Sequence, residues 1–87
     1  MEDFKLIEKV DLNNPVLTLK LLKDKRLAAG NNFGTLNIYD LISYKPDIII
    51  ENEFKEWITN INQLANDDLI VSSKNIVKII KIIKKCF

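Results

Sequence analysis

The sequence predicts an all-β domain, and three observations lead to this expectation. Short runs rich in Val, Ile, Leu and Thr alternate with small polar clusters of the kind that form turns. No run combines the apolar period of a helix with its usual length of about 11–12 residues. The apolar pattern also repeats after 42 residues, so we expect two similar antiparallel units.

Four strands are expected in the first half of the chain. The first alternates apolar with charged side chains, and the cluster Lys23-Asp24-Lys25 separates the second strand from the third. Gly34 precedes the fourth strand and would supply the positive φ that a tight hairpin needs. In chain order these strands are Phe4–Val10, Val16–Leu22, Leu27–Gly30 and Thr35–Leu41.

Four more strands are expected in the second half. They are separated by polar clusters such as Ala65-Asn66-Asp67-Asp68 and Lys74-Asn75. Val16–Leu22 and Ile58–Leu64 carry apolar residues at a helical spacing, but both are too short and too rich in β-branched residues for an ordinary helix. The expected strands are Ile48–Glu51, Ile58–Leu64, Leu69–Ser72 and Ile76–Ile82.

The last of these strands has a second interpretation. Taken alone, residues 76–85 fit an amphipathic helix with isoleucines on one side and lysines on the other, as in peptides that bind membrane surfaces. A strand covered on both faces also needs neighbouring apolar residues, which would explain Ile79 beside Ile80. We favour the strand, because the same positions in the first repeat belong to an expected strand.

The internal repeat is the most informative feature of the sequence. At a separation of 42 residues, Leu6 corresponds to Ile48, Val16 to Ile58, Leu19 to Ile61, Leu22 to Leu64, and Leu27 to Leu69. After the second hairpin, which is one residue shorter, the separation becomes 41, so that Leu36 corresponds to Val77 and Ile38 to Ile79. A period of about 40–45 residues with four short strands is typical of a propeller blade.

The repeats also resemble the WD-repeat family. Residues 27–41, LAAGNNFGTLNIYDL, are similar to the core of that repeat, and Tyr39-Asp40 stands where the family has its Trp-Asp pair. Residues 69–81 follow the same outline, with Ile80-Lys81 in place of that pair. The chain departs from the family in having no histidine, and in having Phe33 where a structural aspartate is expected.

The resemblance implies two four-stranded antiparallel blades of an incomplete WD-repeat β-propeller. The whole chain, 1–87, would be one partial propeller domain, with repeat 1 at about 5–46 and repeat 2 at about 47–87. Tyr39 would lie in the core. Two blades cannot close a ring, which needs about 4–8. The chain is therefore expected to be part of a longer propeller, to complete one with other chains, or to form two collapsed sheets with exposed faces.

Composition excludes several classes of protein. The length of 87 residues allows one small domain, and the net charge of +1 does not favour nucleic-acid binding. Cys86 is the only cysteine, so no disulfide can form within the chain. No apolar run reaches the length of a signal peptide or of a membrane span of about 20 residues. We expect a cytoplasmic protein.

Few residues in the sequence are suited to catalysis. With no histidine, neither Ser-His nor Cys-His chemistry is available, and we expect no enzyme, no cofactor and no metal. Gly30 and Gly34 are not followed by Lys-Ser or Lys-Thr, so a hairpin, not a phosphate loop, accounts for both glycines. The acids that could form a carboxylate pair are more often solvated surface residues: Glu51, Glu53, Glu56, Asp67 and Asp68.

We therefore expect a scaffold or interaction module that binds other proteins, further propeller blades or copies of itself. By resemblance to the family, one rim would carry the partner-binding residues, although Trp57 could equally pack between blades. The alternative is a peripheral protein that binds anionic membranes through residues 74–87. The expected partner-binding residues are Asn31, Asn32, Phe33, Glu56, Trp57, Lys74 and Asn75.

Overall fold

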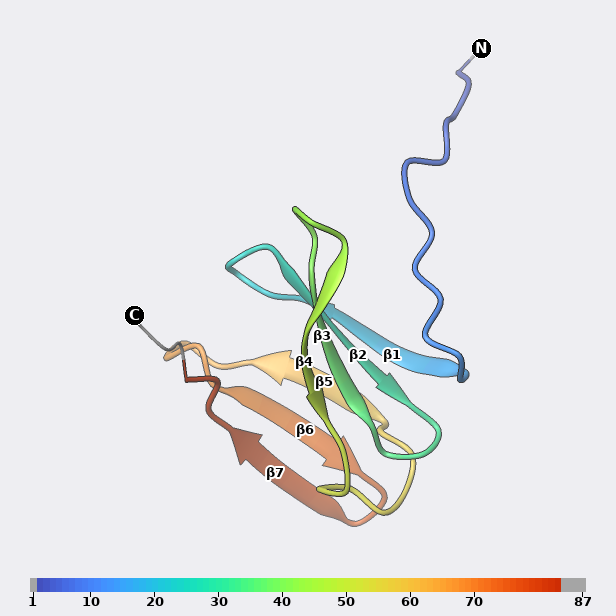
Figure 1. The fold of residues 1–87 in the computed structure, drawn as a ribbon. Coiled ribbons are helices and arrows are strands. Elements are labelled where there is room, and N and C mark those ends of the chain that lie inside the picture. The colour runs from blue at the N-terminus through green and yellow to red at the C-terminus, as the bar shows by residue number, and fades with distance from the viewer. Residues whose placement is uncertain (1, 84–87) are drawn as a thin grey trace.

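The computed structural model describes residues 2–83, and within that range every regular element is a strand (Figure 1). Two antiparallel sheets are present, which we name sheet A and sheet B. In both sheets each strand pairs with the next one along the chain, so the all-β prediction is confirmed. Sheet A contains β1 (Val16–Leu21), β2 (Arg26–Asn31), β3 (Leu36–Asp40) and β4 (Lys45–Ile50), and sheet B contains β5 (Asn60–Gln63), β6 (Leu69–Ser73) and β7 (Ile76–Ile80).

The expected strand Phe4–Val10 is absent. This segment is exposed and irregular, and it extends away from both sheets (Figure 1). Its alternation suits a strand, but a strand needs a neighbour for its N–H and C=O groups, and no sheet edge lies beside it. The prediction of two four-stranded units is thus wrong for the second sheet, which has three strands among the described residues.

The two glycines have different roles. Gly34 lies in the β2–β3 hairpin with φ of +81°, as predicted, and a Cβ there would overlap the carbonyl oxygen of Phe54. Gly30, in contrast, is buried inside β2, so the assignment of this glycine to the hairpin is wrong. A Cβ on Gly30 would lie 2.5 Å from Cγ2 of Ile58, and the glycine therefore lets the segment before β5 approach sheet A.

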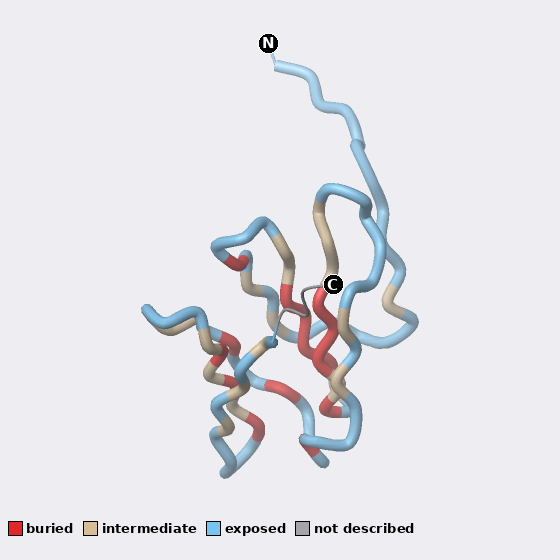
Figure 2. Tube along the Cα trace, turned by 60° about the vertical axis from the view of Figure 1, so that its left-hand side comes forward, coloured by how far each residue is buried: buried red, intermediate tan, exposed pale blue. Residues whose placement is uncertain are grey.

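The core lies between one face of sheet A and one face of sheet B (Figure 2). We call these the inner faces, and the opposite faces the outer faces. Because side chains alternate along a strand, Leu36 and Ile38 point into the core from β3, while Leu69 and Val71 do so from β6. Phe54 and Ile58, in the connection between the sheets, fill the remaining space. The other buried members of the cluster are Leu22, Ala28 and Ile61.

The repeat is visible in the sheets, but equivalent residues have different neighbours. Leu36 and Ile38 are fully buried against sheet B, whereas their counterparts Val77 and Ile79 lie on the outer face of sheet B and are 61% and 63% exposed. Likewise, Ile61 is buried, whereas its counterpart Leu19 is 59% exposed on the outer face of sheet A. Equivalent faces of the two sheets therefore point in the same direction. Only the inner faces, which lie between the two sheets, are covered.

We predict that trimming one methylene from the core is measurable in this small domain. Ile38→Val should lower the free energy of unfolding by about 0.5–1.5 kcal/mol, because the lost contacts cannot be replaced in a buried site. The matched change Ile42→Val, in the exposed β3–β4 turn, should alter it by less than about 0.5 kcal/mol. Urea unfolding measures both, and equal losses would contradict this position of the core.

Candidate functional site

The expected partner-binding residues come together at one end of the sheets. There the β2–β3 hairpin, the connection 51–59 and the β6–β7 hairpin meet. The N–H of Ile58 donates to the carbonyl of Asn31 at 3.0 Å, and Oγ of Ser73 donates to the carbonyl of Glu56 at 3.0 Å. Lys74 Nζ also lies 3.8 Å from Glu56 Oε1. We call this region the loop-end surface.

The loop-end surface presents most, but not all, of the predicted residues to solvent. Phe33 is 66% exposed and Trp57 is 56% exposed, and the side chains of Glu56, Lys74 and Asn75 are exposed as well. Trp57 is thus not packed between the sheets.

Asn31 and Asn32 are placed differently. Asn31 is buried, and its Oδ1 accepts hydrogen bonds from the N–H groups of Phe33 and Thr35, both at 2.9 Å. Its side chain therefore stabilises the hairpin from within and is not available to a partner. Asn32 is half-buried, and its Oδ1 has no hydrogen-bond partner among residues 2–83.

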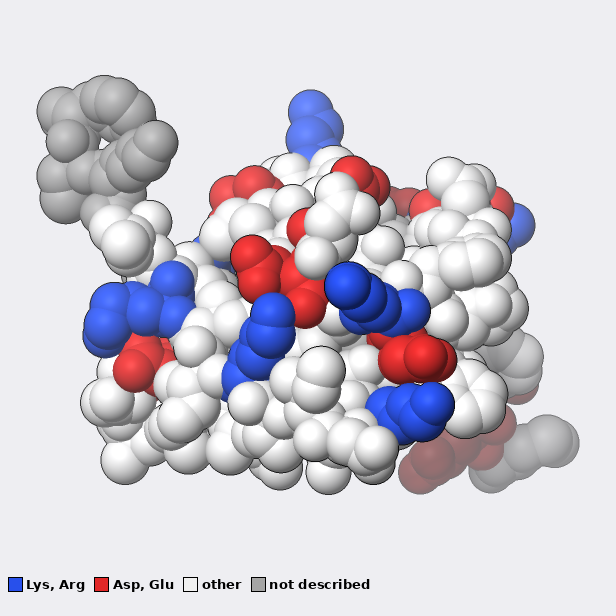
Figure 3. Space-filling model, turned by 90° about the horizontal axis from the view of Figure 1, so that it is seen from below, with Lys and Arg blue, Asp and Glu red and all other residues white. Residues whose placement is uncertain are grey.

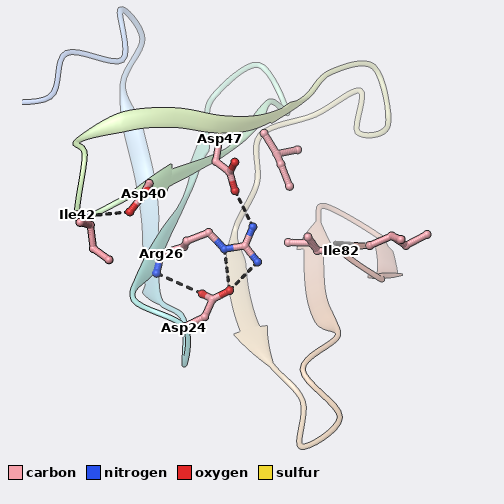
Figure 4. A pocket seen from close by; sticks show the side chains of 8 residues that line it. Asp24, Arg26, Asp40, Ile42, Asp47 and Ile82 are labelled. Atoms are coloured by element: carbon pink, nitrogen blue, oxygen red, sulfur yellow. Dashed lines mark hydrogen bonds and ion pairs between the residues drawn. The ribbon is translucent and has the colours of Figure 1, made fainter. Parts of the chain in front are cut away.

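A second candidate site lies at the opposite end of β2, where Arg26 forms an ion cluster beside a cleft of about 470 Å³ (Figure 4). Nε of Arg26 donates to Asp24 at 2.8 Å, and Nη1 donates to Asp47 at 2.7 Å. The guanidinium group thus joins the β1–β2 turn to β4. The hydrogen bond that Arg26 donates to Asp24, followed by the one that it donates to Asp47, raises the pKa of Arg26 above its ordinary value, against the opposing effect of burial.

The charged groups of this cluster interact with one another, which leaves little for a substrate to bind. The donors of Arg26 already face two carboxylates, and the other lining residues are Asp40, Ile42, Ile48, Ile82 and Ile83. No thiol, imidazole or hydroxyl group is among them. Within residues 2–83, no three Asp, Glu, His or Cys side chains are grouped so that they could hold a metal ion. The cluster is a structural clamp on sheet A.

Four of the five acids that the sequence offered as a carboxylate pair lie beside a lysine. Glu53 binds Lys78 at 3.0 Å and Asp68 binds Lys81 at 3.0 Å. Asp67 lies 3.1 Å from Lys23, and Glu56 lies beside Lys74. Opposite charges accordingly lie next to each other on the face seen in Figure 3.

The same contacts bear on the lysine-rich segment. Residues 76–80 form the strand β7, as predicted, and not an amphipathic helix. Lys78 and Lys81 are both engaged by carboxylates of the same chain. Residues 84–87, which belong to the segment considered for membrane binding, lie outside the described residues.

The outer faces of the two sheets expose several large apolar side chains. The sequence did not single out these residues, although the repeat could have shown them, because a stack of two sheets always leaves two faces uncovered. Side chains between 49% and 63% exposed form the two patches, which are Leu17, Leu19, Leu21 and Ile49 on sheet A, and Val77 and Ile79 on sheet B.

The outer face of sheet A is also hollowed. An apolar cavity of about 210 Å³ lies between this face and the N-terminal segment. Val10 and Leu12 line it from the segment, while Leu19, Ala29 and Tyr39 line it from the sheet. Tyr39, which was expected in the core, is half-buried in this cavity. Residues 10–12 therefore run across the side of sheet A that faces away from sheet B.

Comparison of the chain with protein-family models, with curated proteins and with solved structures gives no match. Over residues 2–83 the structure contains no helix with the length and apolar character needed to cross a membrane. The candidate surfaces are therefore judged on their own geometry and chemistry.

We predict that the Arg26 cluster acts on stability. Arg26→Met keeps the aliphatic stem but leaves Asp24 and Asp47 without their cation, and it should lower the free energy of unfolding by about 1–3 kcal/mol. Arg26→Lys should lose less, because the positive charge remains while the forked geometry is lost. Chemical unfolding of the two variants tests this, and an unchanged midpoint for Arg26→Met would contradict the structural role.

Proposed function

We propose that this chain is a non-catalytic protein–protein interaction module, built from two WD-like, propeller-type blades, that associates through the outer faces of its sheets. The observation that carries the proposal is the exposure of large apolar side chains on both outer faces. Leu19 and Leu21 on sheet A are about as exposed as Val77 and Ile79 on sheet B. Patches of this kind on a folded domain typically mark interaction sites.

The covered interface inside the chain supports the proposal. The residues equivalent to Val77 and Ile79 are Leu36 and Ile38, and these are completely buried by the neighbouring sheet. The outer faces thus have the composition of faces that another sheet covers. A β-sheet buries its apolar faces by packing on a further layer, here about 10 Å away.

The arrangement of the sheets supports the blade interpretation. Sheet A is a four-stranded meander, and sheet B repeats its first three strands. The first strands of the two units, β1 and β5, lie next to each other, as do β2 and β5. In a propeller the first strand of each blade similarly lies nearest its equivalents. The chain would therefore act as part of a larger propeller, or as a subunit that completes one.

A non-catalytic role follows from the residues available. The chain has no histidine, and the carboxylates of the turns are held by lysines and by Arg26. The exposed Phe33 and Trp57 give the loop-end surface two aromatic side chains of the kind that are enriched in interfaces. We propose that this surface contacts a different partner from the one that covers the sheet faces.

We predict that polar substitutions on the outer faces weaken association without unfolding the domain. Ile79→Thr and Leu19→Thr keep a strand-forming side chain but remove much of its apolar surface. Both should reduce self-association in sedimentation velocity and reduce binding of an apolar fluorescent dye. The free energy of unfolding at low protein concentration should change by less than about 0.5 kcal/mol.

The matched control is Phe33→Ser, which removes an equally exposed side chain from the loop-end surface. It should leave self-association unchanged. If Phe33→Ser abolishes association while Ile79→Thr and Leu19→Thr do not, the outer faces are not the interaction surface. An intact chain that neither associates nor binds the dye would refute the proposed function.

A further inference from the structure

We infer that residues 4–8 of one copy of this chain form the fourth strand of sheet B in a second copy, by pairing with the open edge of β7. In the same contact, the outer face of sheet A of the first copy covers the outer face of sheet B of the second. This inference rests on the proposed function, and it names the partner as another copy of the chain.

The first observation is an unpaired strand edge. In sheet A, β3 has β2 on one side and β4 on the other, whereas β7 pairs only with β6 among the described residues. The N–H and C=O groups along the other side of β7 are thus available to a further strand. Within residues 2–83, sheet B has no strand equivalent to β4 of sheet A.

The second observation is a strand-like segment with no sheet. Phe4, Leu6 and Ile7 are 96%, 73% and 72% exposed, which is unfavourable for three large apolar side chains in one short segment. By the 42-residue repeat, Leu6 and Ile7 correspond to Ile48 and Ile49 in the middle of β4. The segment is therefore the counterpart of the strand that sheet B lacks.

The third observation is the length of the connection. In the chain, β4 ends at Ile50 and β5 begins at Asn60, on the sheet stacked against sheet A. The equivalent positions 42 residues earlier are Glu8 and Thr18. Residues 4–8 of one copy, paired with β7 of a second copy, can thus be followed by β1 of a sheet A that stacks on sheet B of the second copy. The connection between the segment and β1 then has the same length as the connection between β4 and β5.

The fourth observation is that the two outer faces have the composition of the covered interface. The outer face of sheet B carries Val77 and Ile79, equivalent to the buried Leu36 and Ile38. The outer face of sheet A carries Leu19, equivalent to the buried Ile61. Stacking sheet A of one copy on sheet B of another therefore repeats, between chains, the packing that already exists within the chain.

The position of the N-terminal segment favours a second copy over the same chain. Residues 10–12 lie against the outer face of sheet A, as the cavity there shows. Sheet B of the same chain is on the opposite side of sheet A, and the segment points away from its own β7 (Figure 1). A contact between different surfaces of identical chains is heterologous, so it closes into a ring if the rotation permits.

The repeat also gives the register. In sheet A, Ile38 pairs with Ile48 and Asn37 pairs with Ile49. The equivalent pairs are Ile79 with Leu6, and Lys78 with Ile7.

The first experiment blocks the backbone pairing. The double variant Leu6→Pro/Ile7→Pro removes two N–H donors and disfavours a strand, whereas Leu6→Ala/Ile7→Ala keeps both donors. In sedimentation velocity, the proline variant should associate at least roughly tenfold more weakly than the alanine variant. Circular dichroism should show unchanged sheets in both, because the segment forms no strand within its own chain.

The second experiment tests the register with engineered cysteines, in a background where Cys86 is replaced by serine. Chains carrying Leu6→Cys are mixed with chains carrying Ile79→Cys and then oxidised. Directly paired antiparallel residues have Cα atoms about 4.5–5.5 Å apart, within the range of a disulfide. Mass spectrometry should find a disulfide between the two kinds of chain, and Ile7→Cys mixed with Ile79→Cys should give far less.

The outcomes separate this inference from the proposed function. If proline and alanine variants associate equally, while Ile79→Thr abolishes association, the outer faces act without strand exchange and only the inference fails. The inference is overturned if Leu6→Cys and Ile7→Cys form disulfides with Ile79→Cys equally well. It is also overturned if a single chain that carries both Leu6→Cys and Ile79→Cys forms the disulfide within itself at high dilution. A chain that stays monomeric but binds the dye also overturns the inference alone.

Discussion

The structure depends on the packing of one face of sheet A against one face of sheet B. Ala28, Leu36 and Ile38 from the first sheet meet Ile61, Leu69 and Val71 from the second, and all six are 0–2% exposed. A sheet has two faces, and the two sheets of the described residues can cover only one face of each other. The compact core and the exposed apolar outer faces are therefore two results of the same limit.

Close approach of the sheets depends on small side chains as much as on large ones. Gly30 leaves the space into which Ile58 packs, and the carbonyl of the next residue, Asn31, accepts the N–H of Ile58. At the other end of β2, Arg26 joins two carboxylates of its own sheet. Strand β2 is thus attached at one end to the connection that precedes β5, and at the other end to the β1–β2 turn and β4. This places the loop-end surface and the Arg26 cluster at opposite ends of one rigid strand.

The arrangement also suggests how a repeat of two units could be useful. The described chain has an unpaired, strand-like segment at residues 4–8 and an unpaired edge at β7, and the segment extends away from that edge. In the proposed association between copies, both parts would be paired, and the outer faces would be covered in the same step. In the separate chain, Lys78 of β7 and the charged residues of the N-terminal segment would limit uncontrolled pairing of the exposed edges.

The sequence by itself determined the class of fold, seven of the eight strands, and the left-handed backbone at Gly34. These features depend on alternation, β-branched residues and turn chemistry, which act between near neighbours in the chain. Only the tertiary structure decided the rest. It left Phe4–Val10 without a partner, buried Asn31 while exposing Trp57, and gave Gly30 a packing role. Each of these features depends on which surfaces are close in space. The deciding fact is that the described residues form two stacked sheets and not a closed ring. The same repeated side chains are core where a second sheet is present and surface where it is absent.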